Sequence, residues 1–305
     1  MPTLLAIGAS LYWALLVTLT AWRLVAPPRR TYAWAISRGV PGDPHEAFGV
    51  TFESVERRLD GGPRVPVWEI AGDAAAGPVV IVSHGWGSGR VEMLGRAKML
   101  RSVASRVVLW DLPGHGESGG LCTLGSRETR LLDRLATDAV ERFARPVVLY
   151  GWSLGAEISI RAAAGRSDIA GLVVDGVYAS GWVPAKRLLA ERGVPWGATL
   201  GPALAVIGTA FGLRPARRFF RMTDVCEGVS APVLMLHGAR DQVAPIDAAE
   251  RIAAARGWRI EIDADAGHAT AWDALSAEAT GFVRGLERRG DAAVSAEPER
   301  DQRSG

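Results

Sequence analysis

The residues best suited to covalent chemistry lie at 151–155, where Gly-Trp-Ser-Leu-Gly follows an apolar, β-branched run. An alanine-rich segment of helical character comes next, so the pattern predicts a strand, a sharp turn carrying Ser153, and a helix. The strand and the helix of such a turn cross closely, which requires small residues two positions before and after the serine, and Gly151 and Gly155 meet this need. The turn would hold the Ser153 hydroxyl at the end of a sheet, as a nucleophile requires.

A serine hydroxyl becomes a good nucleophile only when a base takes its proton and a third group orients that base. His268 lies between the last predicted strand and the last predicted helix, after every candidate carboxylate. The other histidines come earlier in the chain: His45, His84, His115 and His237. The chain order serine, acid, histidine therefore predicts His268 as the base.

Two aspartates could orient this base. Asp241 lies just past the carboxyl end of the predicted strand 232–237, at the edge where open α/β sheets place their sites. Asp175 also ends a predicted strand and remains the main alternative. We expect Asp241 to be the acid.

The developing oxyanion needs two backbone N–H donors. One is expected from Leu154, directly after the nucleophile and at a helix N-terminus. The second is expected from the loop His84-Gly85-Trp86-Gly87, where Trp86 is the best candidate. The Trp86 indole could also serve as an aromatic wall of the site.

The elements that must position these residues alternate between strand and helix after a predicted antiparallel hairpin over 49–70. The predicted strands are 78–82, 106–110, 146–150, 169–175, 232–237 and 258–262, and the predicted helices are 90–102, 127–143, 154–164, 246–255 and 272–287. This alternation with short connections predicts a doubly wound, mostly parallel sheet.

The N-terminal segment has the composition of a membrane span. No charged side chain occurs from Pro2 to Trp22, and about 20 such residues cross a hydrocarbon core as a helix. A cleaved signal peptide is the alternative, but no Lys or Arg precedes the apolar stretch, which is also long for a signal sequence. The flanking basic residues all follow the span, which predicts a cytoplasmic catalytic domain: Arg23, Arg29, Arg30 and Arg38.

The chain divides into a transmembrane anchor (1–26), a juxtamembrane linker (27–47), a catalytic domain (48–288) and a disordered tail (289–305). Residues 178–228 are too long for a normal connection and are expected to form an apolar cap over the site. Their uncharged middle, 194–213, could span a membrane by length alone. That arrangement would put the two halves of one sheet on opposite membrane faces, so a second span is excluded.

Composition narrows the function further. A net charge of +2, with 35 basic residues spread along the chain, gives no electrostatic reason for nucleic-acid binding. Cys122 and Cys226 make no disulfide framework and lack metal-ligand spacing, so free thiols are expected. No cofactor or metal is predicted, and the oligomeric state stays open.

Over about 48–288 the chain resembles the α/β-hydrolase fold serine hydrolases. The segments that carry the resemblance are 84–87, 111–118, 151–155, 237–245 and 267–268. With its N-terminal anchor it is similar to the membrane-tethered esterase and lysophospholipase-like members. The resemblance implies Ser153 as nucleophile, Asp241 as acid, His268 as base and the N–H groups of Trp86 and Leu154 as the oxyanion hole. It also implies that the 111–118 loop is structural, so that Asp111 and His115 have no catalytic role.

We therefore expect a membrane-anchored serine hydrolase that cleaves carboxylic esters, with a small-molecule or lipid ester such as a lysolipid or acylglycerol as substrate. The same three residues could instead serve a thioesterase, an amidase or an acyltransferase. A non-catalytic, membrane-tethered binding protein on a hydrolase scaffold is the alternative from another class. Enzymes with an aspartyl nucleophile, such as dehalogenases and epoxide hydrolases, are excluded because the turn carries Ser153.

Overall fold

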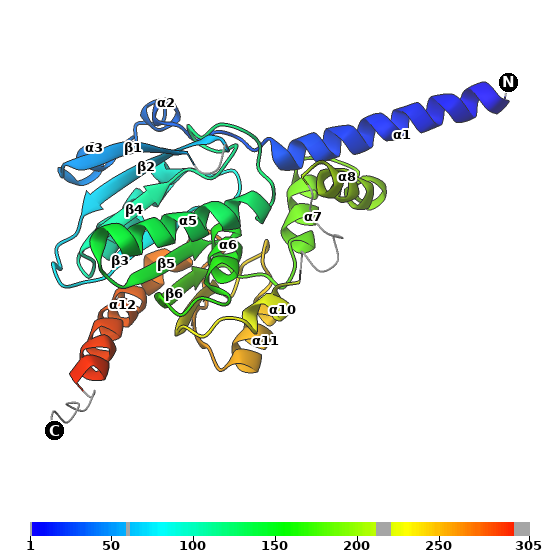
Figure 1. Ribbon diagram of the computed structural model, residues 1–305. Helices are drawn as coiled ribbons and strands as arrows, with labels where there is room; N and C mark the ends of the chain where they lie inside the picture. Colours follow the sequence, from blue (N-terminus) through cyan, green and yellow to red (C-terminus); the bar gives the residue numbers. More distant parts are fainter. Residues whose placement is uncertain (1, 59–61, 212–220, 296–305) are drawn as a thin grey trace, which may run out of the picture.

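One eight-stranded sheet with helices on both faces organises the chain (Figure 1). In the computed structural model, residues 2–58, 62–211 and 221–295 are described. The sheet order is β1-β2-β4-β3-β5-β6-β7-β8. Only the β1–β2 and β2–β4 pairs among these strands are antiparallel, so the mostly parallel sheet and the leading hairpin expected from the sequence are confirmed. The strands are β1 Phe52–Arg58, β2 Arg64–Ala71, β3 Val79–Ser83, β4 Arg106–Trp110, β5 Val147–Trp152, β6 Ile169–Asp175, β7 Val233–Gly238 and β8 Arg259–Asp263.

Helices cover both faces of the sheet, as a doubly wound arrangement requires. One face packs against α5 (Ser126–Phe143), α6 (Leu154–Ala163), α10 (Met222–Cys226) and α11 (Ile246–Arg256). The other packs against α4 (Leu94–Arg101), which follows a 3₁₀ turn at Arg90–Met93, and α12 (Ala271–Ser295). Since both faces are covered, the central strands need apolar side chains throughout, and all five residues of β3 are buried.

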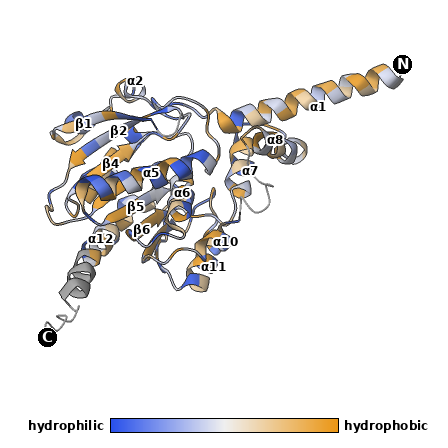
Figure 2. Cartoon of the chain, viewed as in Figure 1, coloured by the Kyte–Doolittle hydropathy of each residue, from blue (hydrophilic) through white to orange (hydrophobic). Residues whose placement is uncertain are grey.

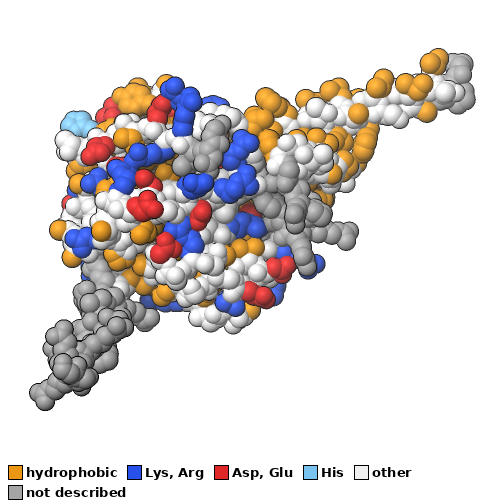
Figure 3. Space-filling model, viewed as in Figure 1, with side chains coloured by type: hydrophobic (Ala, Val, Ile, Leu, Met, Phe, Trp, Pro, Cys, Tyr) orange, Lys and Arg blue, Asp and Glu red, His pale blue; other side chains and the backbone are white. Residues whose placement is uncertain are grey.

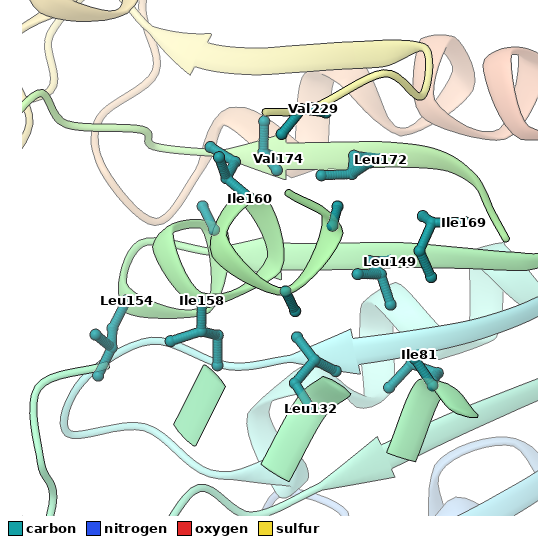
Figure 4. Close-up of a cluster of buried hydrophobic side chains, with 14 of the residues drawn as sticks. Ile81, Leu132, Leu149, Leu154, Ile158, Ile160, Ile169, Leu172, Val174 and Val229 are labelled. Carbon is teal, nitrogen blue, oxygen red and sulfur yellow. The ribbon is translucent and has the colours of Figure 1, made fainter. Parts of the chain in front are cut away.

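The α6 helix, which follows Ser153, is buried along most of its length. Figure 4 shows Leu154, Ile158 and Ile160 of this helix among side chains from α5 and the neighbouring strands. Cys122 and Cys226 are buried free thiols.

Two glycines allow α6 to approach the sheet closely, Gly151 where α6 crosses β5 and Gly155 where α6 meets the end of β3. A Cβ at Gly151 would lie 2.2 Å from the carbonyl oxygen of Gly155, and a Cβ at Gly155 would lie 2.1 Å from that of Ser83. Both contacts would be with backbone, which cannot rotate away as a side chain could. The turn between them puts Ser153 at φ 56°, ψ −114°, a conformation that non-glycine residues seldom adopt.

The N-terminal helix α1 (Pro2–Val25) leaves the body of the molecule as a long apolar arm (Figures 1 and 2). By length and composition, Thr3–Val25 is the one helix among the described residues that could cross a membrane, a test that signal sequences and buried core helices also pass. On the visible face, the arm carries no charged side chains, whereas the body carries many (Figure 3). The predicted linker that follows contains two short helices, α2 (Tyr32–Ile36) and α3 (Pro44–Phe48).

The segment predicted as a cap contains α7 (Trp182–Glu191) and α8 (Trp196–Ala210), followed by α10. Residues 212–220 of this segment lie outside the described residues. Strands β6 and β7, which flank it, pair side by side in one sheet. At the C-terminus, α12 runs to Ser295, into the predicted tail, and residues 296–305 lie outside the described residues.

The close approach of α6 to the end of β3 predicts a strong asymmetry between two Gly→Ala substitutions. Gly155→Ala should destabilise the protein by about 3 kcal/mol or more, because the overlap with backbone cannot be relieved by repacking. For a chain of this size, that corresponds to a fall in Tm of roughly 6–12 °C. Gly281→Ala, on α12 with no atom within 4 Å of the added Cβ, is the matched control and should leave Tm equal or higher. Thermal unfolding in detergent, followed by circular dichroism, measures both; equal Tm values would contradict the prediction.

Candidate active site

Three side chains from separate loops meet at the carboxyl edge of the sheet. His268 Nε2 lies 2.8 Å from Ser153 Oγ, and His268 Nδ1 lies 2.7 Å from Asp241 Oδ2. Ser153 follows β5, Asp241 follows β7, and His268 lies between β8 and α12. Carboxyl ends of parallel strands share one edge, which explains how residues 115 positions apart in the chain come into contact.

The Asp241 carboxylate is fixed on both oxygens. While Oδ2 faces His268, Oδ1 accepts hydrogen bonds from the backbone N–H of Val243 at 2.8 Å and of Ala244 at 2.7 Å. Burial acts to raise the pKa of Asp241, but the hydrogen bond and charge of His268 and the Ala244 N–H outweigh it and hold the pKa below its usual range. Asp241 is therefore ionised at neutral pH and can hold His268 in the tautomer that has its proton on Nδ1.

The alternative acid, Asp175, belongs to a different network. Its Oδ2 accepts hydrogen bonds from Tyr150 Oη at 3.2 Å and from Arg96 Nη2 at 3.4 Å. Burial, which is complete, raises the pKa of Asp175 despite the nearby guanidinium. The Asp175 backbone carbonyl accepts the Ser153 N–H at 2.8 Å, so this residue supports the turn at Ser153 through its main chain.

Leu154 and Trp86 both border the cavity at Ser153. Leu154 is the first residue of α6, and the N–H groups of a first helical turn have no acceptor within the helix. Trp86 follows β3, in the loop whose Gly85 approaches the Ser153 side chain so closely that a Cβ there would lie 3.3 Å from Ser153 Cβ. The Trp86 indole donates a hydrogen bond from Nε1 to the carbonyl of Leu24 at 2.8 Å.

His84, a histidine in another loop of the sheet edge, has both ring nitrogens in hydrogen bonds. His84 Nδ1 donates to the Gly85 carbonyl at 2.8 Å while its Nε2 accepts the Leu112 N–H at 3.0 Å. Complete burial lowers the pKa of His84 to about 4, so the ring is neutral. Asp111 accepts the backbone N–H groups of Arg90 and Glu117 at 2.8 and 3.0 Å, tying its loop to the sheet edge.

An apolar cavity of about 190 Å³ adjoins Ser153 and His268. Its walls come from four regions: the loops of the sheet edge, α6, the helices α7 and α8 of the cap segment, and the end of α1. The lining residues include Leu24, Leu124, Pro184, Ala185, Leu188, Leu204 and Val243.

Sequence reasoning missed several residues of this site. Glu157 lines the cavity, and both of its carboxylate oxygens are engaged, by Tyr178 Oη at 2.7 Å and by Arg161 Nε at 2.9 Å. Trp152 donates a hydrogen bond from Nε1 to the His268 carbonyl at 2.7 Å and so ties the His268 loop to the turn at Ser153. The spacing of Glu157 from Ser153, one helical turn, is the one signal that could have found it.

A sequence profile described as the alpha/beta hydrolase family matches residues 79–281 of the chain. Among curated proteins, the pimeloyl-[acyl-carrier protein] methyl ester esterase of Methylococcus capsulatus is 37% identical over 87 residues, which are 28% of this chain and 32% of that protein. The chain thus matches about a third of the length of this relative.

Solved structures share the fold at low sequence identity. An esterase of Pyrococcus furiosus superposes with a TM-score of 0.66 at 19% identity, covering 88% of this chain and 98% of that one. The 2,6-dihydroxy-pseudo-oxynicotine hydrolase gives a TM-score of 0.61 at 18% identity, covering 80% and 70%. At these identities the likeness concerns the fold alone.

Replacing Asp241 or Asp175 with asparagine should have very different effects on activity. Asp241→Asn should lower kcat by about 10⁴-fold, because an amide cannot hold the required tautomer of His268. Asp175→Asn should retain activity within roughly tenfold, since His268 keeps its partner. Steady-state ester hydrolysis by both variants, with Tm measured alongside to exclude unfolding, makes the comparison. Greater loss in the folded Asp175 variant would reverse the assignment.

Proposed function

Because this chain belongs to the alpha/beta hydrolase family, we propose that it is a serine esterase that cleaves carboxylic esters through an acyl-enzyme intermediate. The observation that carries the proposal is the continuous hydrogen-bonded path from Asp241 through His268 to Ser153. Such a path activates a hydroxyl that is otherwise a weak nucleophile. The esterase names of the curated relative and of one structural neighbour are consistent with this chemistry.

In the proposed mechanism, Ser153 Oγ attacks the ester carbonyl while His268 Nε2 takes the hydroxyl proton. Asp241 stabilises the imidazolium that forms. The oxyanion of the tetrahedral intermediate accepts hydrogen bonds from the N–H groups of Leu154 and Trp86. His268 then protonates the leaving alcohol, and a water molecule activated by the same base releases the acid and restores Ser153.

The size and lining of the cavity favour an apolar acyl group of medium chain length. A protein cavity of ~150 Å³ lined by aliphatic and aromatic side chains accommodates benzene. A cavity of about 190 Å³ would by the same measure take an acyl group of roughly six to eight carbons. An amphiphilic ester is thus the proposed substrate class.

In this proposal, α1 anchors the enzyme in a membrane, with the catalytic domain on the cytoplasmic side. The basic residues after the span support this orientation. Two of them also contact the catalytic domain: Arg29 Nη1 donates to the Ser118 carbonyl at 2.9 Å, and Arg30 pairs with Glu92.

The exposed part of α1 is shorter than a hydrocarbon core, which favours a cap segment that lies at the membrane surface. From Thr3 to Leu16 the helix is exposed or half-exposed, and at 1.5 Å per residue this stretch covers only about 21 Å of a hydrocarbon core about 30 Å thick. The rest of α1 packs against α8. A spanning α1 would therefore draw apolar α8 into the membrane interface, next to amphiphilic substrates.

The esterase proposal predicts the effect of removing the nucleophile. Ser153→Ala should lower kcat for p-nitrophenyl esters by about 10³-fold or more and abolish labelling by a fluorophosphonate probe. Wild-type kcat/KM, measured from acetate to laurate, should peak at acyl groups of roughly six to eight carbons. Full activity in Ser153→Ala would refute the mechanism. Failure of the folded wild type to react with the probe would favour the non-catalytic binding protein. Higher activity on thioesters, on amides or with alcohol acceptors would favour a thioesterase, an amidase or an acyltransferase, respectively.

The membrane proposal predicts that a C-terminal tag is digested by protease in inside-out vesicles of expressing cells and protected in right-side-out vesicles. The protein should stay in the pellet after alkaline carbonate extraction, and its intact mass should include residues 1–26. A mature protein that begins near residue 27 would identify a signal sequence and contradict the anchor.

A further inference from the structure

The last third of α1 is built into the cap rather than left free. Its buried residues recur at the spacing of one helix face: Val17, Thr20, Ala21, Leu24 and Val25. They pack against α8 residues of one apolar cluster, Leu200, Ala203, Leu204 and Ile207. At the centre, the Thr20 hydroxyl donates a hydrogen bond to Thr199 Oγ1 at 2.9 Å, with both side chains fully buried.

The end of α1 is also joined to the loops around Ser153. The last carbonyls of a helix have no partner within the helix. Here the Leu24 carbonyl accepts the Trp86 indole N–H at 2.8 Å, and the Val25 carbonyl accepts the Cys122 N–H at 2.9 Å. The α1 terminus is therefore capped by two loops, the one that carries Trp86 and the one that carries Cys122.

Leu24 lies beside the reacting groups. It is 1% exposed, and it lines the same cavity as Ser153, His268 and Leu204. A tether would need none of these contacts, since any apolar helix holds a protein at a membrane.

We propose that the C-terminal turn of α1 is part of the substrate site, with Leu24 as a specificity-determining residue that sets the length of the acyl group. This inference rests on the proposed esterase function. In this proposal, α1 both faces the membrane and forms one wall of the substrate-binding cavity. Through the Leu24–Trp86 hydrogen bond, the seating of α1 also fixes the position of Trp86.

The test uses the full-length protein in detergent and a series of p-nitrophenyl esters from acetate to laurate. Leu24→Ala should move the preferred acyl group to longer chains by roughly two to three carbons, because three side-chain carbons leave the cavity wall. Leu24→Trp should lower kcat/KM for the octanoate by about tenfold or more while leaving the acetate within about twofold. Leu19→Ala is the matched control: the same substitution on the same helix, at a side chain that is 48% exposed, should leave the whole profile unchanged.

An equal loss on every ester in both Leu24 variants, or an unchanged profile in both, would overturn the proposal. The two variants alter the cavity in opposite directions, so misfolding of one leaves the other informative. Fluorophosphonate labelling of wild-type Ser153 distinguishes failure of the Leu24 proposal from failure of the esterase proposal. If the protein is not an esterase, every variant, including the Leu19 control, will lack both labelling and hydrolysis.

A second measurement addresses the link to Trp86. Trp86→Phe keeps an aromatic ring beside the cavity but removes the N–H that binds the Leu24 carbonyl. It should lower kcat across all chain lengths with little change in KM, since a displaced Trp86 N–H affects the transition state rather than the acyl fit. An unchanged kcat would contradict the positioning role of α1.

Discussion

The close crossing of β5 and α6 is the constraint on which the site depends. There is no room for a Cβ at Gly151, where β5 meets α6, or at Gly155, where α6 meets the end of β3. The turn between these glycines holds Ser153 in a conformation that costs on the order of 1–3 kcal/mol. The surrounding core offsets that cost, because α6 is buried along most of its length. The turn fixed in this way places Ser153 and Leu154 side by side at one cavity.

The order of strands then brings the other groups to that place. Strands β5, β6, β7 and β8 are consecutive neighbours in the sheet, so their carboxyl ends follow one another along one edge. The close contact of Gly238 with the Ala266 carbonyl joins the Asp241 loop to the His268 loop. Hydrogen bonds from Val243, Ala244 and Trp152 fix both partners, so the geometry is largely preformed.

The N-terminal helix links this chemistry to its surroundings. Most of α1 is an exposed apolar arm, yet its last turns pack on α8 and receive hydrogen bonds from the loops beside Ser153. An element that reads in the sequence as a separate anchor thus borders the same cavity as the reacting groups. If α1 spans a membrane, its position determines both how close the catalytic domain lies to the membrane surface and the shape of the cavity.

The sequence by itself determined the alternation of strands and helices, the mostly parallel sheet and the turn at Ser153, because apolar periodicity and glycine spacing are local properties of the chain. It also predicted Ser153, Asp241 and His268, since the residues that end parallel strands must share an edge. It could not separate Asp241 from Asp175 fully, because only the packing of Arg96 and Tyr150 engages Asp175 elsewhere. Nor could it reveal that Leu24 lines the cavity, since the uniform hydropathy of α1 hides which of its faces is buried. Contacts between segments distant in the chain are set by how complete elements pack, and only the tertiary structure decided them.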